Sequence, residues 1–136
     1  MKTNSPIIFG SGDGASFEIS GIERFDDGSG YRGSLSLTSG QFGCKHYDFY
    51  FDNLEHFAKD IQKMYDSLNG KARLKHTYEH DYIELEMRTR GHLTVTGLLT
   101  QQSNHSQELK FSFSVDQSYL PPLISSTELL LQSLKL

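Results

Sequence analysis

The sequence is poor in cysteine, in tryptophan and in long apolar runs. Cys44 is its one cysteine, and it has no tryptophan among 136 residues. Because a lone cysteine forms no internal disulfide, the fold does not depend on oxidation, and this favours a reducing compartment. The N-terminal residues lack the apolar stretch of a secretory signal, and no segment has the length of a membrane span. We therefore expect a cytoplasmic protein that does not bind a membrane.

An excess of basic residues is also missing. The sequence has 13 Lys and Arg against 17 Asp and Glu, which gives a net charge of −4. The acidity belongs to residues 1–69, which hold 6 basic and 10 acidic residues, whereas residues 70–136 hold 7 of each. Phosphate contact normally requires a basic face, so direct binding to nucleic acid is disfavoured. The acidic first half favours a basic partner.

The residues that are present predict a single α+β domain over residues 1–136. The length suits one ordinary domain, and 9 Phe and 7 Tyr supply large side chains for its core. Alternating apolar and polar residues predict antiparallel strands, and one segment has the apolar spacing of a helix. We expect an antiparallel, largely meander sheet of about seven to eight strands, packed against a central helix at about residues 52–68 and followed by a short C-terminal helix.

The first half contains four predicted strands, at residues 7–10, 15–24, 31–38 and 41–51. In two of them the apolar alternation changes phase, near Ser20–Gly21 and near Lys45–His46. Side chains on a strand alternate with a period of two, so a change of phase requires an extra residue. We therefore expect a β-bulge at each of these places.

The central helix is predicted from its ends and from its apolar stripe. Asp52-Asn-Leu-Glu55 resembles a capping box, and Gly70 suits the position after the helix. Apolar residues follow one another at spacings of three and four, as in a helix with one buried face. These residues are Leu54, Phe57, Ala58, Ile61, Met64, Tyr65 and Leu68.

The second half predicts a four-stranded meander. If the apolar faces of its strands are to agree, Met87 lies opposite Leu93, and Lys75 lies opposite Glu86 on the solvent-exposed face, across a four-residue loop at residues 79–82. Residues 101–108 form a polar loop. Residues 118–134 are partly helical, either as one kinked helix or as a turn followed by a shorter helix, with a second possible capping box at residues 125–128.

Candidate catalytic and metal sites have simpler interpretations. Cys44 and His46 lie two residues apart, but no third group is placed to orient them, so a small buried hydrophobic residue beside a surface histidine is favoured. Residues 79–81 bring three possible metal ligands into one turn without the spacing of a metal site. His76 falls on the core-facing phase of its strand, which indicates a hydrogen-bonded or edge histidine. We expect no catalytic residue, no metal and no cofactor.

Tyrosines beside carboxylates are the remaining signal. Tyr50 and Tyr82 fall on the phase opposite to the apolar residues of their strands. Exposed aromatic rings supply contact area and carboxylates supply electrostatic steering, so one interpretation is a protein-binding surface. The other is ordinary cross-strand packing on the solvent-exposed face of the sheet. The candidate partner-binding residues are Asp13, Asp26, Asp27, Asp48, Tyr50, Asp52, Asp81 and Tyr82.

Several segments resemble the WapI family of immunity proteins, the small cytoplasmic partners of toxins delivered between bacterial cells. These segments are residues 40–51 (GQFGCKHYDFYF), the predicted helix at 54–68 with NGKA behind it, residues 91–97 (GHLTVTG), and residues 109–120 with Asp116 and Gln117. The resemblance rests on their order and spacing and covers about residues 34–134.

The resemblance implies a protein that binds the C-terminal domain of a cognate toxin and blocks it by occupancy, with no catalysis of its own. The toxin of the type member is a secreted nuclease that acts on tRNA, so a nuclease is one candidate partner. The oligomeric state is open between monomer and homodimer. Two other classes remain as alternatives: a ligand-binding or scaffold domain with a pocket between helix and sheet, and a small hydrolase.

Overall fold

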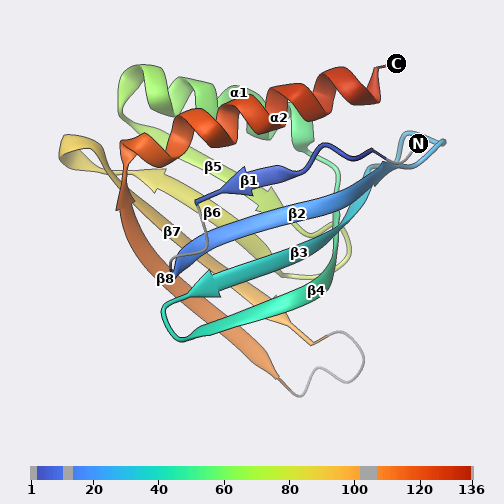
Figure 1. The fold of residues 1–136 in the computed structure, drawn as a ribbon, viewed down its shortest axis with the longest axis horizontal. Coiled ribbons are helices and arrows are strands. Elements are labelled where there is room, and N and C mark those ends of the chain that lie inside the picture. Colours follow the sequence, from blue (N-terminus) through green and yellow to red (C-terminus); the bar gives the residue numbers. More distant parts are fainter. Residues whose placement is uncertain (1–2, 11–13, 102–106, 136) are drawn as a thin grey trace.

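The computed structural model describes residues 3–10, 14–101 and 107–135 and is an α+β fold of two sheets and two helices (Figure 1). The first sheet, in the order β1-β2-β3-β4, consists of Ile7–Phe9, Ala15–Arg24, Tyr31–Ser39 and Phe42–Phe51. The second, in the order β5-β6-β7-β8, consists of Gly70–Lys75, Tyr82–Met87, His92–Thr100 and Glu108–Asp116. Helix α1 is Leu54–Ser67 and helix α2 is Leu120–Leu134. The predicted fold class is confirmed, with the eight strands divided equally between two antiparallel meanders.

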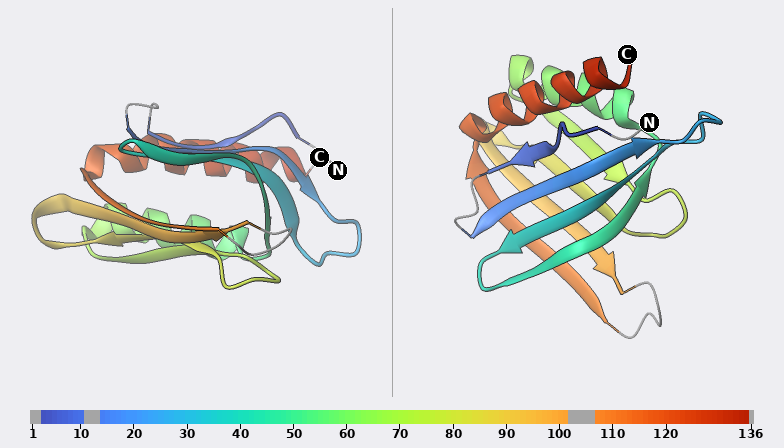
Figure 2. Two further views of the ribbon diagram at one scale, coloured as in Figure 1. Left: turned by 90° about the horizontal axis from the view of Figure 1, so that it is seen from below. Right: turned by 45° about the vertical axis from the view of Figure 1, so that its right-hand side comes forward.

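The two sheets form separate layers, and each helix lies beside the edge of one of them. The view from below shows α2 level with the first sheet and α1 level with the second (Figure 2). A side chain from each helical region bonds the backbone of the neighbouring edge strand. The Ser126 hydroxyl of α2 accepts from the Ile8 N–H at 3.0 Å, and the Asn53 amide donates to the Arg73 carbonyl at 2.7 Å. These bonds cover two strand edges that are otherwise available for pairing with other chains.

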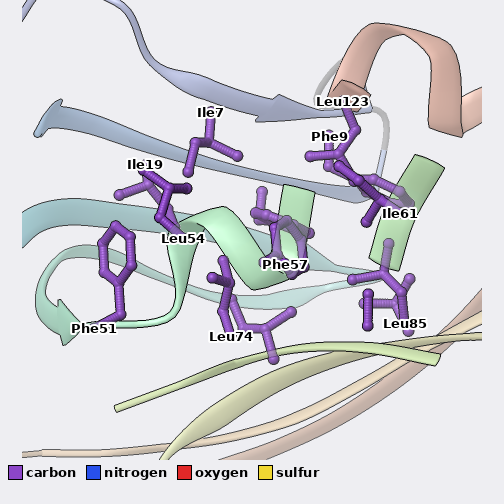
Figure 3. Close-up of a cluster of buried hydrophobic side chains, with 14 of the residues drawn as sticks. Ile7, Phe9, Ile19, Phe51, Leu54, Phe57, Ile61, Leu74, Leu85 and Leu123 are labelled. Carbon is purple, nitrogen blue, oxygen red and sulfur yellow. The ribbon is translucent and has the colours of Figure 1, made fainter. Parts of the chain in front are cut away.

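The core is shared by both sheets and both helices. Figure 3 shows Phe57 and Ile61 of α1 between side chains of the two sheets, with Leu123 of α2 nearby. Phe57, Ile61 and Leu123 are fully buried. The space between helix and sheet, where a ligand pocket was the alternative expectation, is therefore filled by these side chains.

Both predicted bulges are confirmed. The pairing of β2 with β3 shifts between Ser20 and Glu23. In β4, Tyr47 pairs with Leu35 but Cys44 pairs with Leu37, so two residues of β4 face one residue of β3. His46 sits in this bulge with φ of 57°, a left-handed conformation that lets the strand resume its alternation with the opposite phase.

The predicted ends of the central helix are wrong in detail. Asn53 is the N-cap and makes no side-chain capping bond, while Glu55 accepts the hydroxyl of Tyr31 instead of bonding back to the helix start. At the other end Leu68, with φ of 53°, takes the left-handed position expected of Gly70, which begins β5. Tertiary contacts therefore replaced the local caps. Leu68 also leaves the predicted apolar stripe, because it is 44% exposed.

The register of the second sheet is partly as predicted. Met87 pairs with Leu93, as the apolar phases required. The predicted pairing of Lys75 with Glu86 is wrong, because Lys71 pairs with Glu86 and Lys75 pairs with Tyr82. The connecting loop is therefore residues 76–81, longer than predicted. Its first residue, His76, donates its N–H to the Asp81 carbonyl at 2.9 Å in the hairpin register and also forms a bridge to Phe51 of β4.

The C-terminal segment is one helix preceded by a short 3₁₀ turn. The turn spans Gln117–Tyr119, and α2 follows with Pro121 and Pro122 in its first turn, where missing N–H donors cost nothing. The predicted capping box at residues 125–128 is wrong, since these residues lie inside the helix. The hydroxyl of Thr127 instead donates to the Leu123 carbonyl at 2.8 Å. Within the predicted loop at 101–108, residues 102–106 lie outside the described residues.

The core predicts the effect of truncating α1. Phe57→Ala removes a fully buried ring that lies between the sheets, and we expect it to lower the free energy of unfolding by about 3–5 kcal/mol. Urea denaturation followed by circular dichroism measures the loss. Tyr65→Ala is the matched control on the same helix, because that ring is 39% exposed. Equal losses in the two variants would contradict the shared core described above.

Candidate protein-binding surface

Three aromatic rings from different parts of the chain form a row on the surface. We call Phe25, Tyr50 and Tyr78 the aromatic row. The ring of Tyr50 lies 6.2 Å from that of Phe25 and 5.6 Å from that of Tyr78, measured between centroids. Tyr78 is 68% exposed, while Phe25 and Tyr50 are half-buried. The row joins the turn between β2 and β3, strand β4, and the loop between β5 and β6.

Tyr50 takes its place in the row from the alternation of β4. Its neighbours Phe49 and Phe51 are fully buried, so Tyr50 points to the outer face of the first sheet. There it pairs with Arg32, whose guanidinium lies 5.8 Å from the centre of the Tyr50 ring. The same guanidinium approaches Asp48 at 3.4 Å. An aromatic face, a cation and a carboxylate thus already meet at the centre of the row.

Phe25 begins the turn that links β2 to β3. The Phe25 N–H donates to the Gly30 carbonyl at 2.9 Å, and its carbonyl accepts from the Gly28 N–H at 3.1 Å. Inside the turn, the Ser29 N–H donates to the carboxylate of Asp27 at 2.9 Å. Hydrogen bonds from Ser29 lower the pKa of Asp27, so this exposed carboxylate stays charged at neutral pH.

Tyr78 is held by a buried histidine. His76 is 3% exposed, and its Nδ1 accepts the backbone N–H groups of Tyr78 and Glu79, both at 3.1 Å. An Nδ1 that accepts hydrogen bonds is unprotonated. Burial lowers the pKa of His76, against opposing effects of Asp81 and Glu79, and therefore preserves this form. The Thr77 N–H also donates to the Tyr50 carbonyl at 2.8 Å, which fixes the loop to β4.

Asp81 lies inside the protein rather than on the predicted surface. It is 1% exposed, and its Oδ2 accepts the hydroxyl of Tyr47 and, at 2.7 Å, the N–H of Thr100. A buried carboxylate is stable only when such donors replace water. The expectation of an exposed Asp81 is therefore wrong. The sequence could not reveal its donors, because they come from β4 and the end of β7.

The other predicted surface residues lie on two faces. Asp26 and Asp27 are exposed in the β2–β3 turn, Asp48 and Tyr50 lie on the outer face of the first sheet, and Asp52 is exposed after β4. Asp26 and Asp52 line one hollow of about 380 Å³, together with Phe25 and Glu55. Tyr82 lies apart from them, on the outer face of the second sheet, with the Arg73 guanidinium 4.2 Å from its ring centre. Asp13 is outside the described residues.

The outer face of the second sheet differs because its charges are compensated. Arg73 pairs with Glu84 at 3.0 Å, and Lys71 with Glu86 at 3.9 Å. The carboxylates of the first half have fewer cations available, with 6 basic residues for 10 acidic ones. A second aromatic feature, Phe42, is 71% exposed at the far end of the first sheet and lines a hollow of about 810 Å³.

Two observations bear on the candidate catalytic and metal residues. Burial raises the pKa of the Cys44 thiol, which is opposite to what an activated nucleophile needs. Within residues 3–10, 14–101 and 107–135, no group of three His, Cys, Asp or Glu side chains could hold a metal ion. Of the helices in that part of the chain, none is long and apolar enough to span a membrane.

Aromatic rings at a protein surface supply contact area for protein partners. The comparison with known families identifies the chain further: the model of the Immunity protein WapI-like family matches residues 7–135, nearly its whole length. The chain belongs to this family. No curated protein sequence matches it.

Among solved structures, a chain from the crystal structures of Trypanosoma bruciei MRP1/MRP2 has a similar fold. The TM-score is 0.54 at 7% sequence identity, and the alignment covers 99% of this chain and 87% of that one. At this identity the likeness concerns the fold alone.

Two members of the aromatic row, Phe25 and Tyr78, were not among the predicted surface residues. Phe25 stands at the end of a strand, beside a turn recognised only by its composition. Tyr78 continues the core-facing alternation of Ala72, Leu74 and His76, so the pattern predicts it to be inside. The early end of β5 at Lys75 is what places it outside.

The histidine contact predicts a pH-dependent stability. Because the pKa of His76 in the folded protein is below the ordinary 6.5, the unfolded chain binds the proton first as the pH falls. The resulting stabilisation is complete above pH 6.5 and is lost as the pH falls towards the folded pKa. We expect the free energy of unfolding of wild type to fall between pH 7.5 and 5.5 more steeply than that of His76→Gln. His80→Gln, an exposed histidine in the same loop, is the control and should retain the wild-type slope. Equal slopes for wild type and His76→Gln would contradict the role given to Nδ1.

Proposed function

We propose that this chain is an immunity protein that binds a cognate toxin domain and neutralises it by occupancy, without catalysis of its own. The observation that carries this proposal is membership of the WapI-like immunity family over residues 7–135. The partner is the C-terminal domain of a toxin. A nuclease is the toxin class we propose, because an enzyme that holds nucleic acid presents a basic face complementary to the acidic first half of this chain.

The toxin is proposed to bind the side of the molecule formed by the β2–β3 turn and the outer face of β4. Exposed carboxylates support this choice: Asp26, Asp27 and Asp52 have side chains in water, and Asp48 lies beside the aromatic row. Tyr50 supplies aromatic area at its centre. Asp81 is proposed to contribute indirectly, without touching the toxin, by holding the end of the loop that carries Tyr78.

Growth of a bacterial host tests the function itself. The C-terminal domain of any toxin encoded beside this gene is expressed from one inducible promoter and this chain from another. We expect the chain to restore growth and to co-purify with the toxin domain as a stable complex. Neither rescue nor complex formation would reject the proposed immunity function.

Electrostatic steering gives a second test. Reversing the charges of the β2–β3 turn in Asp26→Lys plus Asp27→Lys is expected to lower the association rate by about tenfold at low salt, and by less at physiological ionic strength, because exposed charges are screened. Stopped-flow or surface plasmon resonance measures the rate. Asp66→Lys plus Glu128→Lys makes the same change in net charge on the two helices and serves as the control. An association rate that responds equally to both double variants would assign steering to net charge alone and remove the turn from the interface.

A further inference from the structure

The exposed ring of Tyr78 indicates a role in binding rather than in folding. Its ring is 68% exposed, so it adds little to the core, yet the loop beneath it is fixed by two hydrogen bonds to His76 and by the bond from Thr77 to β4. A loop held in this way loses little conformational entropy on binding, and the Tyr78 ring itself packs against the rings of Tyr50 and His76. Tyr78 is thus presented as a rigid aromatic face at one end of the aromatic row.

The surroundings of the row decide which ligand it can take. Exposed aromatic faces bind nucleic-acid bases by stacking, cations through the electron-rich ring, and apolar groups by contact. Base stacking is accompanied by a positively charged groove for the phosphates. Here the hollow beside Phe25 is lined by three carboxylates, of Asp26, Asp52 and Glu55, against one cation, Arg24. The excess of negative charge repels phosphate and attracts a cation. A second copy of this acidic chain is disfavoured for the same reason.

The row already holds one such cation within the chain. The Arg32 guanidinium lies 5.8 Å from the centre of the Tyr50 ring and 3.4 Å from Asp48, which places a cation against both an aromatic ring and a carboxylate. Tyr78, the next ring of the row, is open to a cation from outside, and the carboxylates that attract such a cation lie along the row, at Tyr50 and at Phe25. Guanidinium suits it best, because it is planar, is weakly hydrated and stacks on aromatic faces.

We propose that the aromatic row is the anchor site for an arginine side chain of the toxin, which lies on the face of Tyr78 with Phe25 and Tyr50 extending the contact. This inference rests on the proposed function, since it names the chemistry by which that partner is recognised. It goes beyond the acidic residues that steer association, because the row determines how long the complex lasts.

Substitutions at Tyr78 separate a cation contact from simple apolar contact. Tyr78→Phe keeps the aromatic face and is expected to bind the toxin domain like wild type. Tyr78→Leu keeps apolar area but loses the aromatic face, and it is expected to raise Kd by about 3- to 30-fold, mainly through faster dissociation. Phe42→Leu, at the other strongly exposed ring, is the matched control and should leave Kd unchanged. Isothermal titration calorimetry with the toxin C-terminal domain measures Kd, and thermal melts verify that each variant is folded.

The position of the partner's cation follows from a double-mutant cycle. Surface arginines of the toxin domain are changed one at a time to methionine, and we expect one of them to lose its effect when combined with Tyr78→Leu. Full additivity for every arginine would overturn the inference, as would wild-type affinity in Tyr78→Leu or an equal loss in Phe42→Leu.

Two further outcomes are distinguishable from these. If wild type forms no complex with the toxin domain, the proposed function fails and the anchor site fails with it. If a labelled oligo(dT) binds wild type but not Tyr78→Leu, the row is a base-stacking surface and the arginine assignment is overturned.

Discussion

The structure depends on the burial of the apolar face of α1 between two sheets. Leu54, Phe57 and Ile61 are fully buried, and each contacts a core to which both halves of the chain contribute. A four-stranded sheet with one apolar face needs a second layer to exclude water from that face. Here each sheet is the second layer of the other, and the two helices occupy the side where the layers would otherwise be open (Figure 2).

This arrangement brings β4 of the first sheet against the loop between β5 and β6 of the second sheet. The bridge between Phe51 and His76 joins the two sheets directly, and Asp81 accepts hydrogen bonds from Tyr47 and Thr100 at the same junction. The junction contains a histidine and a carboxylate because several backbone N–H groups there have no strand partner, and buried N–H groups must be satisfied. The aromatic row lies on its outer side. Its geometry therefore follows from how the two sheets meet.

Much of the fold could be predicted from the sequence because the responsible signals are local. The change of apolar phase at Lys45–His46 requires a bulge whatever the surroundings, and the structure has one. The pairing of Met87 with Leu93 follows from parity across a short loop. The prediction for Lys75 used the same parity but placed the loop at residues 79–82, whereas Lys75 pairs with Tyr82 and the loop is residues 76–81. The predicted helix caps were also wrong, because Glu55 accepts a hydrogen bond from the Tyr31 hydroxyl of β3 instead.

By itself the sequence determined the strands, the central helix, the acidic character of the first half and the family resemblance that the match over residues 7–135 confirms. These properties depend on composition and on the order of neighbouring residues. Only the tertiary structure decided that Asp81 is buried, that Tyr78 is exposed, and that Phe25, Tyr50 and Tyr78 form one row. The physical reason is that these three rings come from segments distant in the chain, and their meeting depends on how the two sheets pack.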